Sequence, residues 1–148
     1  MPSASGRCDR PRLVRDWLPL LVLLAATFVV SSIPGDHLPP LGSWNADKLL
    51  HAVEFSVIGA LLLRLLRRTS WGARATVAVL LAVVMTSAWG ALDEVHQLLT
   101  PNRSSDWRDW VADTAGALVG ALIYLAAVRA RTAGPGKVGA ADPGGAAP

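Results

Sequence analysis

The chain has 148 residues, of which 52% are hydrophobic and only 17% are charged. Because about a quarter of the residues in soluble globular domains are charged, this composition excludes an ordinary soluble domain and indicates a membrane protein. The net charge is +3, but the basic residues form short clusters between apolar runs instead of one basic face, so we predict no nucleic-acid binding. Cys8 is the single cysteine, which excludes an intrachain disulfide.

The chain begins with a polar segment, residues 1–16, which contains four arginines and is predicted to be a mobile cytoplasmic N-terminal tail. The first apolar run, residues 17–33, ends at Pro34-Gly35 and is close to the roughly 20 residues that cross about 30 Å of hydrocarbon as a helix. A cleavable signal peptide is the alternative. It is disfavoured because no clear Ala-x-Ala site follows and the run is long for that role.

Three more apolar runs follow a loop that covers residues 34–46. Asn45 is the predicted N-cap of a second helix that ends near Leu66. A third helix is expected over residues 73–98, and a fourth over residues 105–128. Residues 129–148, rich in Gly, Ala and Pro, are predicted to be a disordered cytoplasmic tail. The expected fold is all-α: a four-transmembrane-helix bundle in one membrane domain, residues 17–128.

The orientation of this bundle follows from where its basic residues lie. Arginines and lysines gather in the N-terminal tail, in the loop around residues 64–74 and in the C-terminal tail. Cytoplasmic loops carry an excess of Lys and Arg, so both termini are predicted to be cytoplasmic. The acidic ends of the second, third and fourth helices then meet at the outer surface, together with Lys48, Arg103 and Arg108.

Polar residues at these helix ends are spaced so that each set shares one helix face. Charged side chains that face lipid cost roughly 2.5–3.5 kcal/mol each on insertion scales, so they should turn inward and meet. Glu54 and Asp113 are the deepest of them. We predict one polar pocket that binds a ligand and is formed by Asp47, Lys48, His51, Glu54, Asp93, Glu94, His96, Gln97, Arg103, Ser104, Asp109 and Asp113.

Carboxylates outnumber fixed cations in this pocket, and they cannot all stay ionised at low dielectric without compensation. Protonated carboxyls, charged histidines, a bound cation or a cationic ligand group would each provide it. Some residues have simpler explanations: Asp47 and Asp106 as helix caps, Arg103 as a turn residue, His51 and His96 as interhelical hydrogen-bond partners. No helix carries two histidines at i, i+4, so no metal site and no cofactor are predicted.

Packing and turn signals accompany the polar ones. Gly116 and Gly120 form a small-xxx-small pair that lets a neighbouring helix approach the fourth helix closely. Asn102 tolerates the left-handed conformation and is expected to direct Arg103 across the mouth between the third and fourth helices, where its fork meets either carboxylates or an anionic ligand.

The ordered set of these motifs resembles the VanZ-like membrane protein family. The residues that carry the resemblance are Asp47-Lys48-x-x-His51, Asp93-Glu94-x-His96-Gln97, Pro101-x-Arg103-Ser104, Asp109, Ala112-Asp113-Thr114-x-Gly116 and Gly120, within residues 20–128. Two positions depart from the family pattern: Phe55 stands where an aromatic hydroxyl is frequent, and Asn102 where glycine is frequent.

The resemblance implies a small multi-pass protein of the bacterial plasma membrane, in a family named for a member associated with resistance to teicoplanin, a lipoglycopeptide. The favoured function is binding of a lipoglycopeptide or lipid-linked cell-envelope ligand, with membrane lipids as further partners. The first alternative is a membrane enzyme that acts on a lipid-linked envelope substrate by carboxylate and histidine acid–base chemistry. The second is a subunit of an ion-coupled transporter.

Overall fold

The computed structural model describes residues 13–38 and 44–133. Within them, four long helices account for most of the chain: α1 (Leu18–Ser31), α2 (Trp44–Leu66), α3 (Ala75–Leu98) and α4 (Trp107–Thr132). Each is long and apolar enough to cross a membrane. The all-α prediction is therefore confirmed for the described residues, and the chain is a multi-pass membrane protein. The cytoplasmic placement of the termini stays a prediction.

Several helix boundaries differ from the predicted ones by a few residues. A π-helical turn, Leu13–Trp17, precedes α1, so the helical part starts before the predicted end of the N-terminal tail. Helix α2 starts at Trp44, which puts Asn45 inside the helix instead of at its N-cap. Helix α4 continues to Thr132 through the exposed residues Arg129–Thr132, and the tail predicted beyond it lies outside the described residues from residue 134 on.

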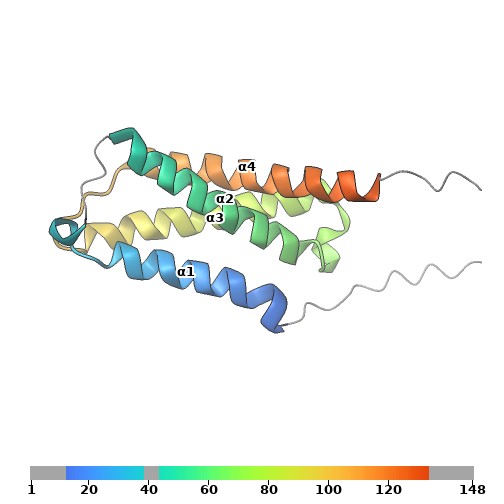
Figure 1. Cartoon of the computed structure of the whole chain (residues 1–148), viewed down its shortest axis with the longest axis horizontal. Helices are drawn as coiled ribbons and strands as arrows, with labels where there is room; N and C mark the ends of the chain where they lie inside the picture. The colour runs from blue at the N-terminus through green and yellow to red at the C-terminus, as the bar shows by residue number, and fades with distance from the viewer. Residues whose placement is uncertain (1–12, 39–43, 134–148) are drawn as a thin grey trace, which may run out of the picture.

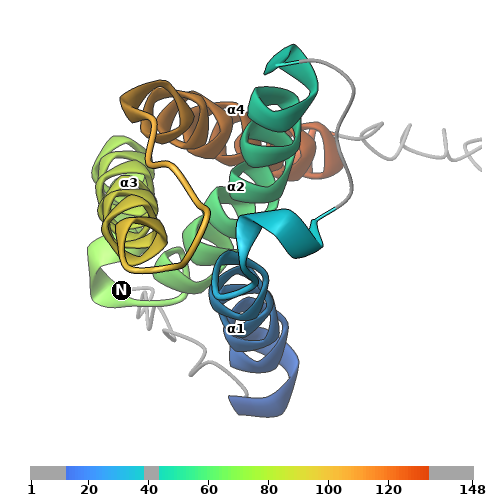
Figure 2. The same cartoon turned by 90° about the vertical axis from the view of Figure 1, so that its left-hand side faces the viewer.

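The helices lie side by side along one axis (Figure 1). Seen along that axis, α2 lies between α1 and α4, and α3 fills the remaining side (Figure 2). The closest pair is α2 and α4. A Cβ on Gly116 would lie 2.2 Å from the carbonyl oxygen of Ala52, and one on Gly120 would lie 1.8 Å from that of Ser56. The predicted close approach at the two glycines is confirmed, with α2 as the neighbour.

A small apolar core holds the bundle together. Phe55, Ile58 and Leu63 of α2 are almost completely buried and pack with Ala82 of α3 and Ala121 of α4. The large apolar side chains on the outer faces of all four helices are exposed, as expected for a surface that hydrocarbon covers. Polar groups inside such a bundle must find partners within the protein.

One buried acid closes the end of the bundle at which α1 begins. Asp16 is 1% exposed, and its two carboxylate oxygens accept from Arg64 at 2.9 Å and from Arg68 at 2.6 Å. The predicted tail therefore ends in a residue that ties the start of α1 to the end of α2. The polar residues at the start of α2, the end of α3 and the start of α4 lie at the opposite end of the bundle.

Candidate functional site

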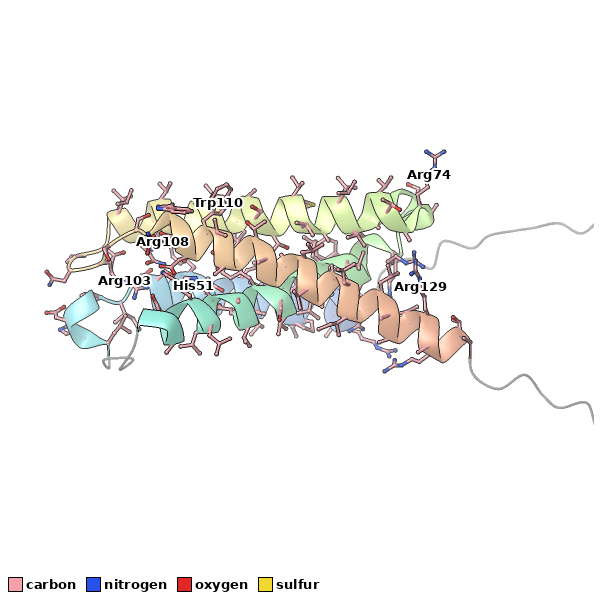
Figure 3. All side chains as sticks on the ribbon, turned by 90° about the horizontal axis from the view of Figure 1, so that it is seen from above. His51, Arg74, Arg103, Arg108, Trp110 and Arg129 are labelled. Carbon is pink, nitrogen blue, oxygen red and sulfur yellow. The ribbon has the colours of Figure 1, made fainter. Side chains whose placement is uncertain are left out.

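The polar end of the bundle is formed where α2 begins, α3 ends and α4 begins. His51, Arg103 and Arg108 lie together at this end, whereas Arg74 and Arg129 lie at the other (Figure 3). The structure thus brings the predicted polar residues of three helices to one level, as their spacing suggested.

Lys48 connects the first turn of α2 to the start of α4. Its Nζ lies 3.0 Å from Asp106 Oδ2 and 2.5 Å from Asp109 Oδ1. Asp106 also caps α4, because its side chain accepts from the backbone N–H of Arg108 at 2.9 Å. That N–H and the Lys48 ammonium hold the pKa of Asp106 below its ordinary value. The predicted cap is confirmed, and it doubles as one half of an interhelical ion pair.

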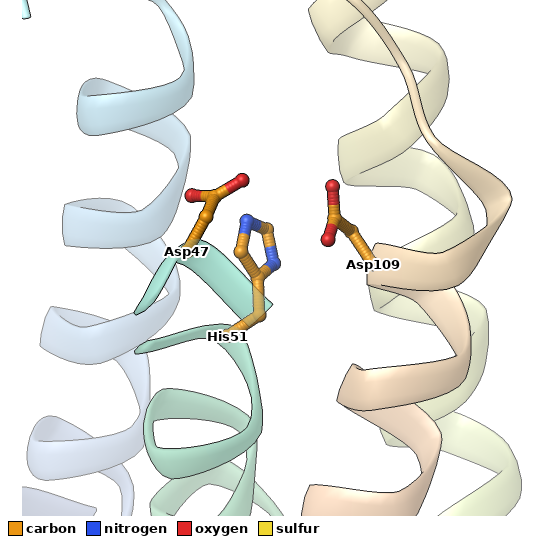
Figure 4. Close-up of side chains that lie close together, drawn as sticks. All are labelled: Asp47, His51 and Asp109. Carbon is orange, nitrogen blue, oxygen red and sulfur yellow. The ribbon is translucent and has the colours of Figure 1, made fainter. Parts of the chain in front are cut away.

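His51 lies one turn deeper and joins α2 to the buried acid of α4. Its Nδ1 is 3.0 Å from Oδ1 of Asp113, which is completely buried. The second oxygen of that carboxylate, Oδ2, has no hydrogen-bond partner among the described residues. The imidazole also stands between the carboxylates of Asp47 and Asp109 (Figure 4). His51 is therefore the residue at which the acids of two helices converge.

Glu94 of α3 holds the chain segment that leads into α4. Its Oε2 accepts from Ser105 Oγ at 2.7 Å and from the backbone N–H of Asp106 at 2.8 Å. The other oxygen, Oε1, is buried and has no partner among the described residues. The residue directly before Glu94, buried Asp93, accepts from Gln97 Nε2 at 2.8 Å, one turn further along α3. Glu94 thus has a structural contact on one oxygen only, which leaves the other for a different partner.

The turn before α4 places Arg103. Asn102 has φ 55°, so the predicted left-handed conformation is confirmed. The backbone N–H of Gly35 donates to Pro101 O at 3.1 Å, which ties this turn to the segment after α1. Among the described residues, Arg103 forms no ion pair with a carboxylate, and its buried Nε has no partner. The predicted carboxylate clamp is therefore not formed among the described residues.

Two predicted pocket residues, His96 and Glu54, form contacts with α1 or with the segment directly after it. His96 stacks on Phe28, with ring centroids 4.4 Å apart, and its Nε2 lies 2.9 Å from Ser32 Oγ. Glu54 accepts from Thr27 of α1, so the expected meeting with Asp113 does not occur. Glu54 is rotated by about 60° from His51 around α2, and this rotation turns it toward α1.

Two cavities converge on the polar end and share four lining residues: Leu38, Asp47, His51 and Arg103. The larger, about 450 Å³, lies between α1 and α2. Its surface is largely apolar and includes Leu23, Val30, Leu50 and Val53, and Thr27, Glu54 and Asp93 also line it. The smaller, about 280 Å³, is polar, and Gln97, Ser104, Asp106 and Asp109 contribute to it. Together they form a space with an apolar part and a polar part.

The comparisons with known proteins agree with the motifs that line this space. A family model described as VanZ/LLP1 matches residues 12–129. The chain belongs to the VanZ/LLP1 family. In the same comparisons, no curated protein and no solved structure matches it. The family match spans all four helices, so the polar end of this VanZ/LLP1 protein is part of the family's domain and not an addition to it.

The structure adds Thr27 and Leu38 to the residues that sequence reasoning had placed at the site. Thr27 lines the larger cavity and donates to Glu54. A lone hydroxyl in the middle of an apolar run was the available signal. Leu38 lines both cavities, but nothing in its sequence context distinguishes it from any other loop leucine.

Side chains with metal-binding atoms also come together here, although no metal site was predicted. One group is Asp47, His51 and Asp109, and the other is His51, Glu94 and Asp113, with one ligand atom from each residue within 4.8 Å of the others. The prediction relied on ligand pairs within one helix. Both groups instead draw on different helices, which spacing along the chain does not reveal.

Proposed function

We propose that this protein sits in the bacterial plasma membrane and binds an anionic, lipid-linked cell-envelope ligand at its outer surface. In this proposal the apolar chain of the ligand lies in the larger cavity, and its headgroup enters the smaller one. Binding of this kind would change how envelope precursors or lipoglycopeptides meet at the surface, in line with the resistance for which the family is named.

The observation that carries the proposal is the position of Arg103. It lines both cavities and has a buried Nε without a partner among the described residues. A buried guanidinium nitrogen without an acceptor is costly. A phosphate or carboxylate oxygen at this junction would accept from it, and the planar fork suits such groups bidentately. Arg103 lies where the apolar and polar cavities meet, and in an amphiphile the charged headgroup joins the apolar chain at the corresponding point.

The shape of the larger cavity supports a lipid-linked ligand. Leucine and valine side chains of α1 and α2 make its surface largely apolar, although Asp47, Glu54 and Asp93 also line it. Both helices expose apolar side chains outward. A hydrocarbon chain there would be buried against apolar surface, at about 0.8 kcal/mol per buried methylene. A water-soluble anion without a hydrocarbon chain would gain no such burial free energy in this cavity.

The outward orientation rests on the basic residues at the opposite end, which include Arg64, Arg68, Arg74 and Arg129. Such clusters stay on the cytoplasmic side. Reporters fused after residues 70 and 135 should therefore be cytoplasmic, and one inserted near residue 40 should be outside. Cytoplasmic activity of the residue-40 reporter would reverse the orientation.

The test compares Arg103→Lys with Arg108→Lys. Arg108 is an exposed residue whose side chain lies over the Trp107 ring at 5.3 Å. Arg108→Lys therefore makes the same chemical change at the same end of the bundle, but at a side chain that lines neither cavity. We expect Arg103→Lys to reduce copurification of an anionic envelope lipid, measured by native mass spectrometry, by about tenfold. Arg108→Lys should retain it. Equal retention in both variants would contradict the proposal.

A second candidate function is a membrane enzyme, which the His51–Asp113 pair favours. A buried carboxylate that accepts from a histidine Nδ1 orients the imidazole as a general base, and His51 lines both cavities. Lipid extracts of cells with and without the protein distinguish the two functions. A new covalent lipid product indicates the enzyme, whereas an unmodified lipid bound to the protein indicates the binding function.

A further inference from the structure

We propose that one divalent cation binds where α2, α3 and α4 meet, held by His51, Glu94 and Asp113. This site does not depend on the lipid-linked ligand proposed above. His51 lines the polar cavity, whereas Glu94 and Asp113 do not. The site uses side chains other than Arg103, the residue of the proposed ligand contact.

The geometry comes from three helices at once. One ligand atom from each of His51, Glu94 and Asp113 lies within 4.8 Å of the other two. A tetrahedral ion with bonds of about 2.0–2.2 Å separates neighbouring ligand atoms by about 3.4 Å. Small side-chain movements therefore bring the three groups to bonding distance, without a change in the helix positions.

Two orphaned oxygens point to a missing partner. Glu94 is 6% exposed and Asp113 is 0% exposed, yet Glu94 Oε1 and Asp113 Oδ2 have no hydrogen-bond partner among the described residues. Buried carboxylate oxygens without a donor are rare in proteins and costly. A cation bound by both carboxylates would satisfy both oxygens.

Protons alone do not resolve these two oxygens. A charged His51 donates through Nδ1 to Asp113 Oδ1, which leaves Asp113 Oδ2 and Glu94 Oε1 as they are. A proton placed on either orphaned oxygen neutralises that carboxyl group but turns the oxygen into a donor that needs an acceptor of its own. A multivalent cation would serve as the partner of both oxygens at once and would need no further acceptor.

The group closer to the surface, Asp47, His51 and Asp109, is a weaker candidate because it already has a cation. The Lys48 ammonium lies 2.5 Å from Asp109 Oδ1. No lysine or arginine forms an ion pair with Glu94 or Asp113 within the described ranges, residues 13–38 and 44–133. The ion is therefore placed in the deeper group.

The ligand set selects the class of ion. One imidazole nitrogen and two carboxylates suit zinc, manganese or ferrous iron, whereas calcium prefers oxygen ligands throughout and magnesium keeps most of its waters. An ion in this position would tie three helices together. It would also add positive charge next to the polar cavity, where an anionic headgroup would benefit from it.

Manganese serves as the probe in the test. The full chain is treated with chelator, reconstituted in phosphatidylcholine nanodiscs and titrated with Mn²⁺, and bound metal is counted by elemental analysis. Pulsed EPR then reports whether a nitrogen nucleus is bonded to the manganese. We expect one Mn²⁺ per chain with one imidazole nitrogen, displaced by Zn²⁺. Glu94→Gln should weaken binding at least about tenfold, and His51→Gln should remove the nitrogen signal.

Controls come from an exposed pair on the turn after α1. Asp36→Asn and His37→Gln remove the accessible carboxylate and imidazole that would bind metal adventitiously, and both variants should keep the manganese. Wild-type protein without stoichiometric Mn²⁺, or with Mn²⁺ that lacks a nitrogen coupling, overturns the proposal without any variant having to fold. Loss of binding in Asp47→Asn but not in Glu94→Gln overturns the placement. Neither result affects the Arg103 test.

Discussion

Two buried aspartates at opposite ends of the bundle differ in how their carboxylates are satisfied. Asp16 is 1% exposed and Asp113 is 0% exposed. Both oxygens of Asp16 accept from guanidinium groups, those of Arg64 and Arg68. Asp113 has one partner, His51, and one oxygen with none. Two equally buried acids therefore differ in role. Asp16 is fully hydrogen-bonded and holds two helices together, whereas Asp113 keeps one carboxylate oxygen without a partner.

The charge balance around the two acids explains this difference. Two fixed cations flank Asp16. At the polar end, by contrast, Lys48 serves both Asp106 and Asp109, and Arg103 forms no ion pair within the described part of the chain. Buried charges are stabilising only when their partners are complete. The same substitution, Asp to Asn, should therefore mainly reduce stability at Asp16 and mainly reduce cation binding at Asp113.

The largest effect is expected for Asp16→Asn. It removes the charge that compensates two arginines, and breaking a buried pair costs 3–5 kcal/mol, which we reduce to about 2 kcal/mol because both guanidinium groups are partly exposed. The free energy of unfolding in mild detergent should fall by that amount. Manganese and lipid binding per folded molecule should not change. A loss of binding at full stability would show that this end, too, belongs to the site.

The matched substitution Asp113→Asn should cost little stability and abolish cation binding. The amide oxygen still accepts from His51. The amide N–H groups replace an oxygen without a partner and are costly to bury, but the unsatisfied buried charge disappears and offsets that cost, so metal-free variant and wild type should unfold within about 1 kcal/mol of each other. Thermal unfolding of both, with and without Mn²⁺, checks this. A destabilisation as large as that of Asp16→Asn would remove the distinction between the two acids.

The smallest effect is expected at Asp106 and depends on pH. Its pKa in the folded protein lies below the ordinary value of 3.8 because of the Arg108 N–H and the Lys48 ammonium. A lowered pKa stabilises the folded state above the unfolded-state value, and that stabilisation is lost as the pH falls through the folded-state value. Asparagine also caps helices, so Asp106→Asn isolates the charge.

The difference in unfolding free energy between wild type and Asp106→Asn should stay constant above about pH 5 and shrink below about pH 4. A pH series of chemical unfolding measures it. A difference that persists in acid would mean that the cap, and not the ion pair with Lys48, carries the contribution of this residue.

Several features of this protein follow from its sequence alone, because they depend on residues close together in the chain. The apolar runs predict the four helices, since their length must match the membrane. Asp106 is a cap and Asn102 has a positive φ because both properties are local. The glycines at 116 and 120 indicate a close helix approach, which the contacts with Ala52 and Ser56 confirm.

The partners of the polar residues depended on the tertiary structure. Spacing shows which side chains share a face of one helix, but the rotation of each helix about its own axis is decided by packing, here by the contact of α2 with the glycines of α4. That rotation turns Glu54 to Thr27 and brings His51 to Asp113. It also brings Glu94 of α3 close to His51 and Asp113, so that the three residues of this group come from three different helices.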